Sequence, residues 1–93
     1  MGISQGARRR LVTERTKMAM PETNIGLFPD VGGGWFLART PGRLGEYLGL
    51  TGNVMHAAAA LYAGLADAVV PSNALAELAA SLRASTFASG DDV

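Results

Sequence analysis

The chain has 93 residues, of which 48% are hydrophobic and 17% are charged, and its formal net charge is zero. This length allows one domain at most, and a neutral chain offers no electrostatic basis for binding nucleic acid or an anionic membrane surface. Cysteine is absent, which excludes disulfides and thiolate chemistry. With His56 as the single histidine, a histidine-based metal site or a Ser-His-Asp triad is difficult to build. We therefore expect no metal, nucleic-acid or membrane partner. The high share of hydrophobic residues also predicts an apolar surface that further polypeptide covers.

The first part of the chain is predicted to be extended or irregular. The basic run 8–10 is expected to be a solvated turn. Residues 11–16 alternate in polarity and are partly β-branched, which predicts a short strand. Residues 17–20 are predicted to be a second extended piece, because Pro21 follows and disfavours helical geometry in the residue before it. Residues 23–29 are predicted to be a loop, since glycine and proline interrupt them.

The second part is predicted to be mostly helical, with each element delimited by glycine, proline or a capping residue. Helices are predicted over 35–40, 43–50 and 55–63, the last of these ended by Gly64, and a short strand over 67–71. Ser72 or Asn73 is expected to cap a final helix, in which the apolar residues recur at helical spacing: Leu75, Leu78, Ala79 and Leu82. We expect one domain over 1–84 and a flexible tail over 85–93.

Two carboxylates, Glu22 and Asp30, lie eight positions apart in the segment 20–35 with no other charge between them. Their neighbours are Met, Pro, Ile, Leu, Phe, Val and Trp, which is how an enzyme surrounds a group whose protonation it controls. The structural alternative for Glu22 is an N-cap or loop acid that backbone N–H groups satisfy, and Asp30 is also suited to cap the helix that follows it. Phe28 and Trp35 are candidate pocket walls, with core packing as the alternative for both.

These residues resemble the crotonase superfamily, also called the enoyl-CoA hydratase/isomerase superfamily. The segment 19–34 is similar to that of the 3-hydroxyisobutyryl-CoA hydrolases within it. Further positions match the superfamily's later signature in order and spacing: 50–52, Ala57, Ala60, 64–65 and 69–71. The resemblance covers residues 2–71. It implies an α/β fold in which β-β-α turns form a spiral, present here as a crotonase-like piece truncated at both ends.

The resemblance implies hydrolysis of 3-hydroxyisobutyryl-CoA to 3-hydroxyisobutyrate and CoA, a step of valine degradation. Glu22 would act as general base toward water or as nucleophile, and Asp30 would orient the water or the substrate hydroxyl. Both acids, with Phe28 and Trp35, would contact the substrate. The oxyanion-hole N–H groups of the superfamily precede the segment that begins at Gly2, so we expect the isolated chain to be inactive.

The resemblance implies no metal and no organic cofactor, because CoA arrives as part of the substrate. It allows a homo-oligomer, since superfamily members commonly form trimers, and we expect a cytoplasmic location. The nearest alternative is a hydratase of the same superfamily. Hydratases use two glutamates, which align with Gly2 and Glu22, and have a glycine at Asp30, so both differences favour the hydrolase. Some isomerases carry acids at the positions of both Glu22 and Asp30. The alternative of another class is a non-catalytic remnant, or a module that packs onto another subunit.

Overall fold

The computed structural model describes residues 1–87 of the chain. In chain order the elements are the 3-10 helix η1 (Ser4–Gly6), strand β1 (Leu11–Val12), 3-10 helix η2 (Pro21–Ile25), helices α1 (Gly33–Leu37), α2 (Leu44–Thr51) and α3 (Ala57–Tyr62), strand β2 (Ala68–Val69), 3-10 helix η3 (Ser72–Ala74) and helix α4 (Leu75–Ala84). Residues 85–87 belong to no helix or strand, and the rest of the expected tail, 88–93, lies outside the described residues.

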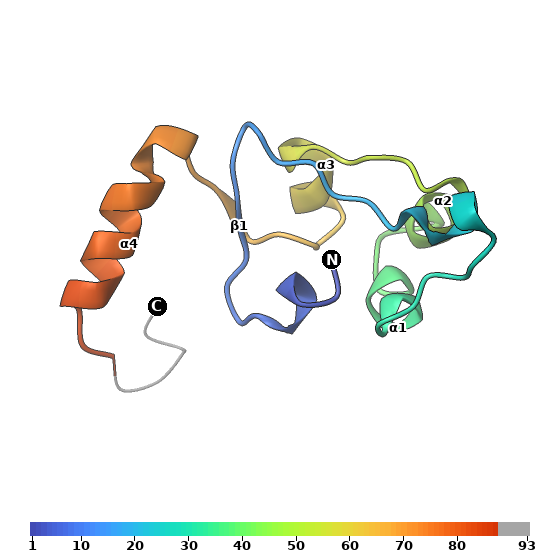
Figure 1. Ribbon diagram of the computed structural model, residues 1–93, viewed down its shortest axis with the longest axis horizontal. Coiled ribbons are helices and arrows are strands. Elements are labelled where there is room, and N and C mark those ends of the chain that lie inside the picture. Colours follow the sequence, from blue (N-terminus) through green and yellow to red (C-terminus); the bar gives the residue numbers. More distant parts are fainter. Residues whose placement is uncertain (88–93) are drawn as a thin grey trace.

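The elements form an elongated arrangement, with α4 at one end, α1 and α2 at the other, and β1 and α3 between them (Figure 1). The principal extents are 45 × 27 × 24 Å. The Cα radius of gyration is 14.8 Å, whereas a compact domain of this length has a radius of gyration of roughly 12 Å. The chain is therefore more open than a domain that encloses its own core.

Both predicted strands form, but each is shorter than expected. Strand β1 covers Leu11–Val12 of the predicted 11–16 and pairs in parallel, residue by residue, with β2 at Ala68–Val69. The chain then leaves the sheet in a turn. The N–H of Thr13 donates to Thr16 Oγ1 at 2.9 Å, and the Thr13 carbonyl accepts the Thr16 N–H at 3.0 Å. These local bonds use the backbone groups that a longer strand would need, so the strand stops.

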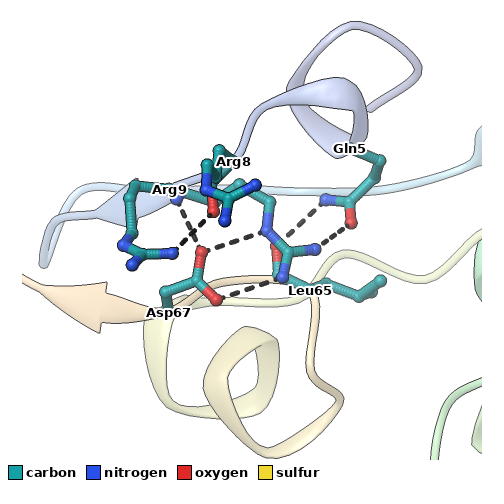
Figure 2. A network of polar contacts seen from close by, with 6 residues as sticks. Gln5, Arg8, Arg9, Leu65 and Asp67 are labelled. Carbon is teal, nitrogen blue, oxygen red and sulfur yellow. Dashed lines mark hydrogen bonds and ion pairs between the residues drawn. The ribbon is translucent and has the colours of Figure 1, made fainter. Parts of the chain in front are cut away.

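Arg10 links the residues that precede the two strands. Figure 2 shows this polar network, in which Gln5, Leu65 and Asp67 are labelled. Its Nε and Nη2 donate to the two carboxylate oxygens of Asp67 at 3.2 and 3.1 Å, and its backbone N–H donates to Asp67 Oδ2 at 2.7 Å. Arg10 Nη1 also donates to Gln5 Oε1 at 2.6 Å, and Gln5 Nε2 donates to the Leu65 carbonyl at 2.9 Å. The turn predicted over 8–10 therefore has a structural role at Arg10, which joins η1 to the sheet.

The extended piece predicted over 17–20 is confirmed by an antiparallel bridge between Met18 and Met55. The Met18 N–H donates to the Met55 carbonyl at 2.9 Å, and the Met55 N–H donates back at 2.7 Å. Because this bridge uses both backbone groups of Met55, α3 begins at Ala57 and not at 55 as predicted. Gly64 follows α3 in the left-handed region at φ +75° and ends it, as expected.

The loop predicted over 23–29 is partly wrong, because η2 continues through residue 25. Pro21 occupies the first position of this helix. Its fixed φ is compatible with a helix, and the N–H that proline lacks would have no partner within the helix at this position. Buried Met20 precedes it and fixes the start of η2 in the core. Gly26 ends the helix in the left-handed region at φ +78°. Glu22 is therefore held on a helical turn and not on an irregular loop.

Helices α1 and α2 pack together closely through a glycine. Helix α1 begins and ends earlier than the predicted 35–40. Its last residue is Leu37, whose carbonyl accepts a hydrogen bond from the Thr40 hydroxyl at 2.8 Å. Helix α2 agrees with the predicted 43–50 to within one residue at each end. Gly45 of α2 is buried against α1, where a Cβ atom would overlap the Leu37 carbonyl oxygen. Only glycine allows this approach.

The buried side chains form two small clusters that leave much apolar surface outside. The larger comprises Met20, Phe36, Leu37, Leu48, Met55, Ala63 and Leu65, and the smaller comprises Val12, Ala60 and Ala66. By contrast, Ile25, Phe28 and Leu50 are each 75% exposed. Such an excess of exposed large apolar side chains is typical of a surface that other polypeptide covers.

Helix α4 forms as its apolar spacing predicts, but none of its residues is buried among the described part of the chain. The expected cap by Ser72 or Asn73 is wrong, because neither η3 nor α4 has a cap bond from the side chain at its N-terminus. Instead the Glu14 carboxylate accepts the Ser72 N–H at 3.0 Å and also accepts the Ser72 hydroxyl. An acid from the turn after β1 therefore anchors the start of η3 and α4.

Candidate active site

Glu22, the first predicted acid, lies in the first turn of η2 and is half-buried. Its backbone carbonyl accepts the Leu27 N–H at 2.9 Å, which closes the turn. The helix has no cap bond from a side chain. The structural alternative, in which Glu22 is a capping acid, is therefore not observed. The fold therefore holds the backbone of Glu22 in a hydrogen-bonded turn that has no cap bond from a side chain.

Asp30, the second predicted acid, is exposed and lies in the turn that leads into α1. The N-cap of α1 is Gly32, and again no side chain caps this helix. It is the backbone carbonyl of Asp30 that accepts the Gly33 N–H, at 2.7 Å. The capping alternative for the Asp30 carboxylate is thus not observed either, and this carboxylate projects from a hydrogen-bonded turn.

The two acid-bearing segments are joined through the start of α1. Gly33 is buried, and an ideal Cβ atom on it would lie 3.0 Å from Met20 Cε and 3.1 Å from Pro29 Cβ. Met20 stands two positions before Glu22, and Pro29 directly precedes Asp30. A side chain at Gly33 would therefore push the two segments apart. This close contact explains why a glycine is suited to position 33, within the glycine run after Asp30. The glycine run is not a nucleotide-binding loop.

An open groove of about 710 Å³ lies between the η2 region, α1 and α2. Its lining is mostly apolar and includes several glycines: Thr23, Leu27, Phe28, Pro29, Gly34, Leu37, Ala38, Gly42, Gly45, Glu46, Gly49 and Leu50. The charged residue of this lining, Glu46, pairs with Arg43 at 2.7 Å. Neither Glu22 nor Asp30 lines the groove. The chain therefore presents its two acids outside this apolar space.

Phe28 and Trp35, the predicted pocket walls, differ in their placement. Phe28 lines the groove but is largely exposed. Trp35 does not line it and is 65% exposed, with the Arg39 guanidinium 3.6 Å from its ring centroid. Arg39 Nη1 also donates to the Trp35 carbonyl at 2.7 Å. Core packing, the alternative for both residues, is not observed, and the described residues leave the apolar neighbours of the two acids open.

The described residues offer no metal site and no membrane span. They contain no group of three or more histidine, cysteine, aspartate or glutamate side chains that could hold a metal ion. No helix in this part of the chain is long and apolar enough to cross a bilayer. His56 is exposed at the N-cap of α3, with its Nδ1 3.2 Å from the Thr16 carbonyl oxygen.

One close contact beside Asp30 has no signal in the sequence. Gly2 lies against Val31, such that an ideal Cβ atom on Gly2 would be 2.6 Å from Val31 Cγ2. Val31 has a φ of +48°, an outlying conformation for a β-branched residue. No local pattern predicts either feature, since a valine normally disfavours this conformation and the partner lies 29 positions earlier (31 − 2). The structure thus adds Gly2 and Val31 to the surroundings of the second acid.

Comparison with known sequences gives a consistent set of relatives. The chain is 53% identical over 81 residues to the probable 3-hydroxyisobutyryl-CoA hydrolase 2 of Arabidopsis thaliana, a match that covers 87% of this chain and 21% of the relative. It is 46% identical over 93 residues to the mitochondrial 3-hydroxyisobutyryl-CoA hydrolase of Mus musculus, and this match covers 100% of this chain and 24% of that relative. The chain spans about a fifth to a quarter of the length of these relatives.

Comparison with solved structures gives the same fold. The crystal structure of an enoyl-CoA hydratase from Rhodobacter sphaeroides 2.4.1 matches with a TM-score of 0.83 and 49% sequence identity, over 86% of this chain and 24% of that chain. This match confirms the predicted α/β fold as a partial crotonase-type fold. The family model described as enoyl-CoA hydratase/isomerase matches residues 1–93, the full chain. The chain therefore belongs to the enoyl-CoA hydratase/isomerase family.

Proposed function

We propose that the chain carries the acid-bearing part of a thioester hydrolase that converts 3-hydroxyisobutyryl-CoA to 3-hydroxyisobutyrate and CoA. The observation that carries the proposal is the presentation of Glu22 and Asp30, neither of which caps the helix that begins beside it. The names of the Arabidopsis and mouse relatives support the same reaction. Because the chain spans only part of those relatives, the proposal concerns the protein in which this segment is surrounded by the rest of the fold.

Thioester hydrolysis needs a proton acceptor, a nucleophile and stabilisation of the carbonyl oxygen. In one route Glu22 takes a proton from water as the water oxygen attacks the carbonyl carbon. The carbon–sulfur bond then breaks, and the departing thiolate of CoA takes up a proton. In the other route a Glu22 oxygen attacks the carbonyl carbon, thiolate leaves, and water opens the resulting anhydride to restore the carboxylate. Asp30 orients the water or the substrate hydroxyl in both routes.

The open surroundings of the two acids support the expectation that the isolated chain is inactive. Phe28 and Val31, neighbours of the acids in sequence, are 75% and 66% exposed. Asp30 is itself exposed, and an exposed carboxylate gains little from apolar neighbours because solvent screens it. The rest of a full-length crotonase fold would cover these side chains and supply the oxyanion donors. Phe28 and Trp35 are proposed to contact the substrate in that enclosed site.

The proposal needs no metal and no organic cofactor, since CoA enters as part of the substrate. A homo-oligomer, no nucleic-acid partner and no membrane partner remain predictions, and sedimentation of the purified protein measures the first. The expected cytoplasmic location also stays a prediction. The mouse relative is named as mitochondrial, which favours a different location.

The decisive experiment places this segment in a complete fold. In the chimera, the 93 residues replace the matching residues of the mouse relative, and release of free thiol from 3-hydroxyisobutyryl-CoA is measured. We expect the chimera to turn over substrate and the 93-residue chain alone to be inactive. Glu22→Gln and Asp30→Asn should each lower kcat by at least about 100-fold. Glu77→Gln, in exposed α4, is the matched control and should leave kcat unchanged. An active chimera that keeps its kcat in both amide variants would contradict the proposal.

The same chimera separates the alternatives. Hydration of crotonyl-CoA at a rate above thioester cleavage would favour a hydratase. A folded chimera that is inactive toward both substrates would favour the non-catalytic alternative. Multiple turnovers in water labelled with oxygen-18 test the anhydride route, because the label enters the Glu22 carboxylate only when water attacks the Glu22 carbon of an anhydride.

A further inference from the structure

The backbone turn that carries Asp30 is strained at an identifiable residue. Among the described residues, Val31 is the one non-glycine residue with a positive φ, at +48°, and Gly32 follows with φ +79°. The Asp30 carbonyl accepts the Gly33 N–H at 2.7 Å across these two residues. Positive φ at both central residues defines the I′ type of turn, in which glycine, asparagine and aspartate are the usual occupants. A β-branched residue at the first central position is unfavourable.

Such strain persists only where the surroundings fix it, and it concentrates at active sites. Two contacts fix it here. On one side, Gly33 packs against Met20 and Pro29, where an ideal Cβ atom would lie 3.0 Å from Met20 Cε and 3.1 Å from Pro29 Cβ. On the other side, the Val31 side chain occupies the space that a side chain at Gly2 would fill, since an ideal Cβ on Gly2 would lie 2.6 Å from Val31 Cγ2 and 2.9 Å from Val31 Cβ.

We propose that the contact between Gly2 and Val31 positions the Asp30 carboxylate, with Val31 as the positioning residue. The inference rests on the proposed function in so far as Asp30 acts in thioester hydrolysis. The Asp30 carboxylate caps no helix, and the backbone of its turn fixes the direction of the Asp30 Cα–Cβ bond, from which the carboxylate extends. That backbone is set by the Val31 side chain, which is wedged against Gly2. A methyl group on Gly2 would displace Val31, and removal of the Val31 side chain would release the turn.

The structural arm of the test uses the 93-residue chain and amide hydrogen exchange. The reporter is the Gly33 N–H, which the Asp30 carbonyl accepts, and the reference is the Met55 N–H, which bonds to the Met18 carbonyl at 2.7 Å. In Gly2→Ala and in Val31→Ala, which removes the Val31 methyl groups but keeps a Cβ atom at a positive φ, the Gly33 amide should exchange at least about 10-fold faster while the Met55 amide is unchanged. Gly6→Ala is the matched control, because a Cβ there meets nothing within 4 Å. An unprotected Gly33 amide in the parent chain, or equal exchange in all variants, would overturn the inference.

The kinetic arm uses the chimera. Gly2→Ala and Val31→Ala should each lower kcat by about 10- to 100-fold with KM within about 2-fold, as expected when a catalytic group is displaced by about 1 Å. Because both substitutions break one contact, the double variant should lose no more than the more affected single variant. Multiplied losses, or a change in KM alone, would refute a positioning role.

The two experiments distinguish a failure of the proposed function from a failure of this inference. If the parent chimera does not cleave 3-hydroxyisobutyryl-CoA, the proposed function fails, and the exchange pattern alone decides whether Gly2 and Val31 hold the turn. If the parent chimera is active but Gly2→Ala matches Gly6→Ala in both kcat and Gly33 exchange, the inference fails and the proposed function stands.

Discussion

Replacing Gly45 by alanine should separate α1 from α2. A Cβ atom at this position would overlap the carbonyl oxygen of Leu37 and would lie 2.6 Å from its carbonyl carbon and 2.8 Å from Thr40 Oγ1. A backbone carbonyl cannot rotate away as a side chain can, so the cost should reach the upper end of the about 1–3 kcal/mol typical of overpacking. Loss of the bond from the Thr40 hydroxyl to Leu37 adds about 1 kcal/mol. The better helix propensity of alanine returns about 1 kcal/mol.

The expected net loss for Gly45→Ala is therefore about 3 kcal/mol of unfolding free energy, a large part of the roughly 5–14 kcal/mol typical of a chain of this length. Gly34→Ala is the matched control, because a Cβ on Gly34 meets nothing within 4 Å and its φ is not positive. It should raise the unfolding free energy by about 0.5 kcal/mol. Urea unfolding followed by far-ultraviolet circular dichroism measures both. An unfolding midpoint of Gly45→Ala at or above that of the parent chain would refute the steric reasoning.

Three further predictions concern the contacts that join distant segments. The Ser72 hydroxyl, which bonds to the Glu14 carboxylate, holds the pKa of Glu14 below its usual value. This contact therefore stabilises the fold above the usual pKa of glutamate and is lost as the pH falls through the lowered value, so the protection factor of the Ser72 amide should fall at acid pH in the parent chain but not in Glu14→Gln. Hydrogen bonds from Arg10 lower the pKa of Asp67, and Arg10→Lys, which lacks the planar fork, should raise it; an unchanged NMR titration of Asp67 would contradict this. Leu48→Ala empties a buried position and should cost about 2–5 kcal/mol, measured as a lower urea midpoint.

Local chemistry in the sequence was sufficient to predict several elements. Gly64 ends α3 because glycine adopts the left-handed conformation without steric cost, and this requirement involves only adjacent residues. The apolar spacing of α4 predicts its helix for the same reason, since a helix repeats over a few residues. The loop predicted over 23–29 was partly wrong, because Pro21 suits the first turn of a helix as well as it suits a loop.

The sequence by itself indicated the family, which the comparisons confirm, and it predicted the pair of acids, Glu22 and Asp30, because both depend on residue types at fixed spacing within one short segment. It could not show that Glu14 anchors Ser72, 58 positions away, or that Val31 is wedged against Gly2. Those contacts exist only when the chain folds back on itself, and their cost or benefit depends on which atoms arrive at each site. Tertiary structure also decided that the apolar neighbours of the acids stay exposed, because burial requires a second surface that these described residues do not provide.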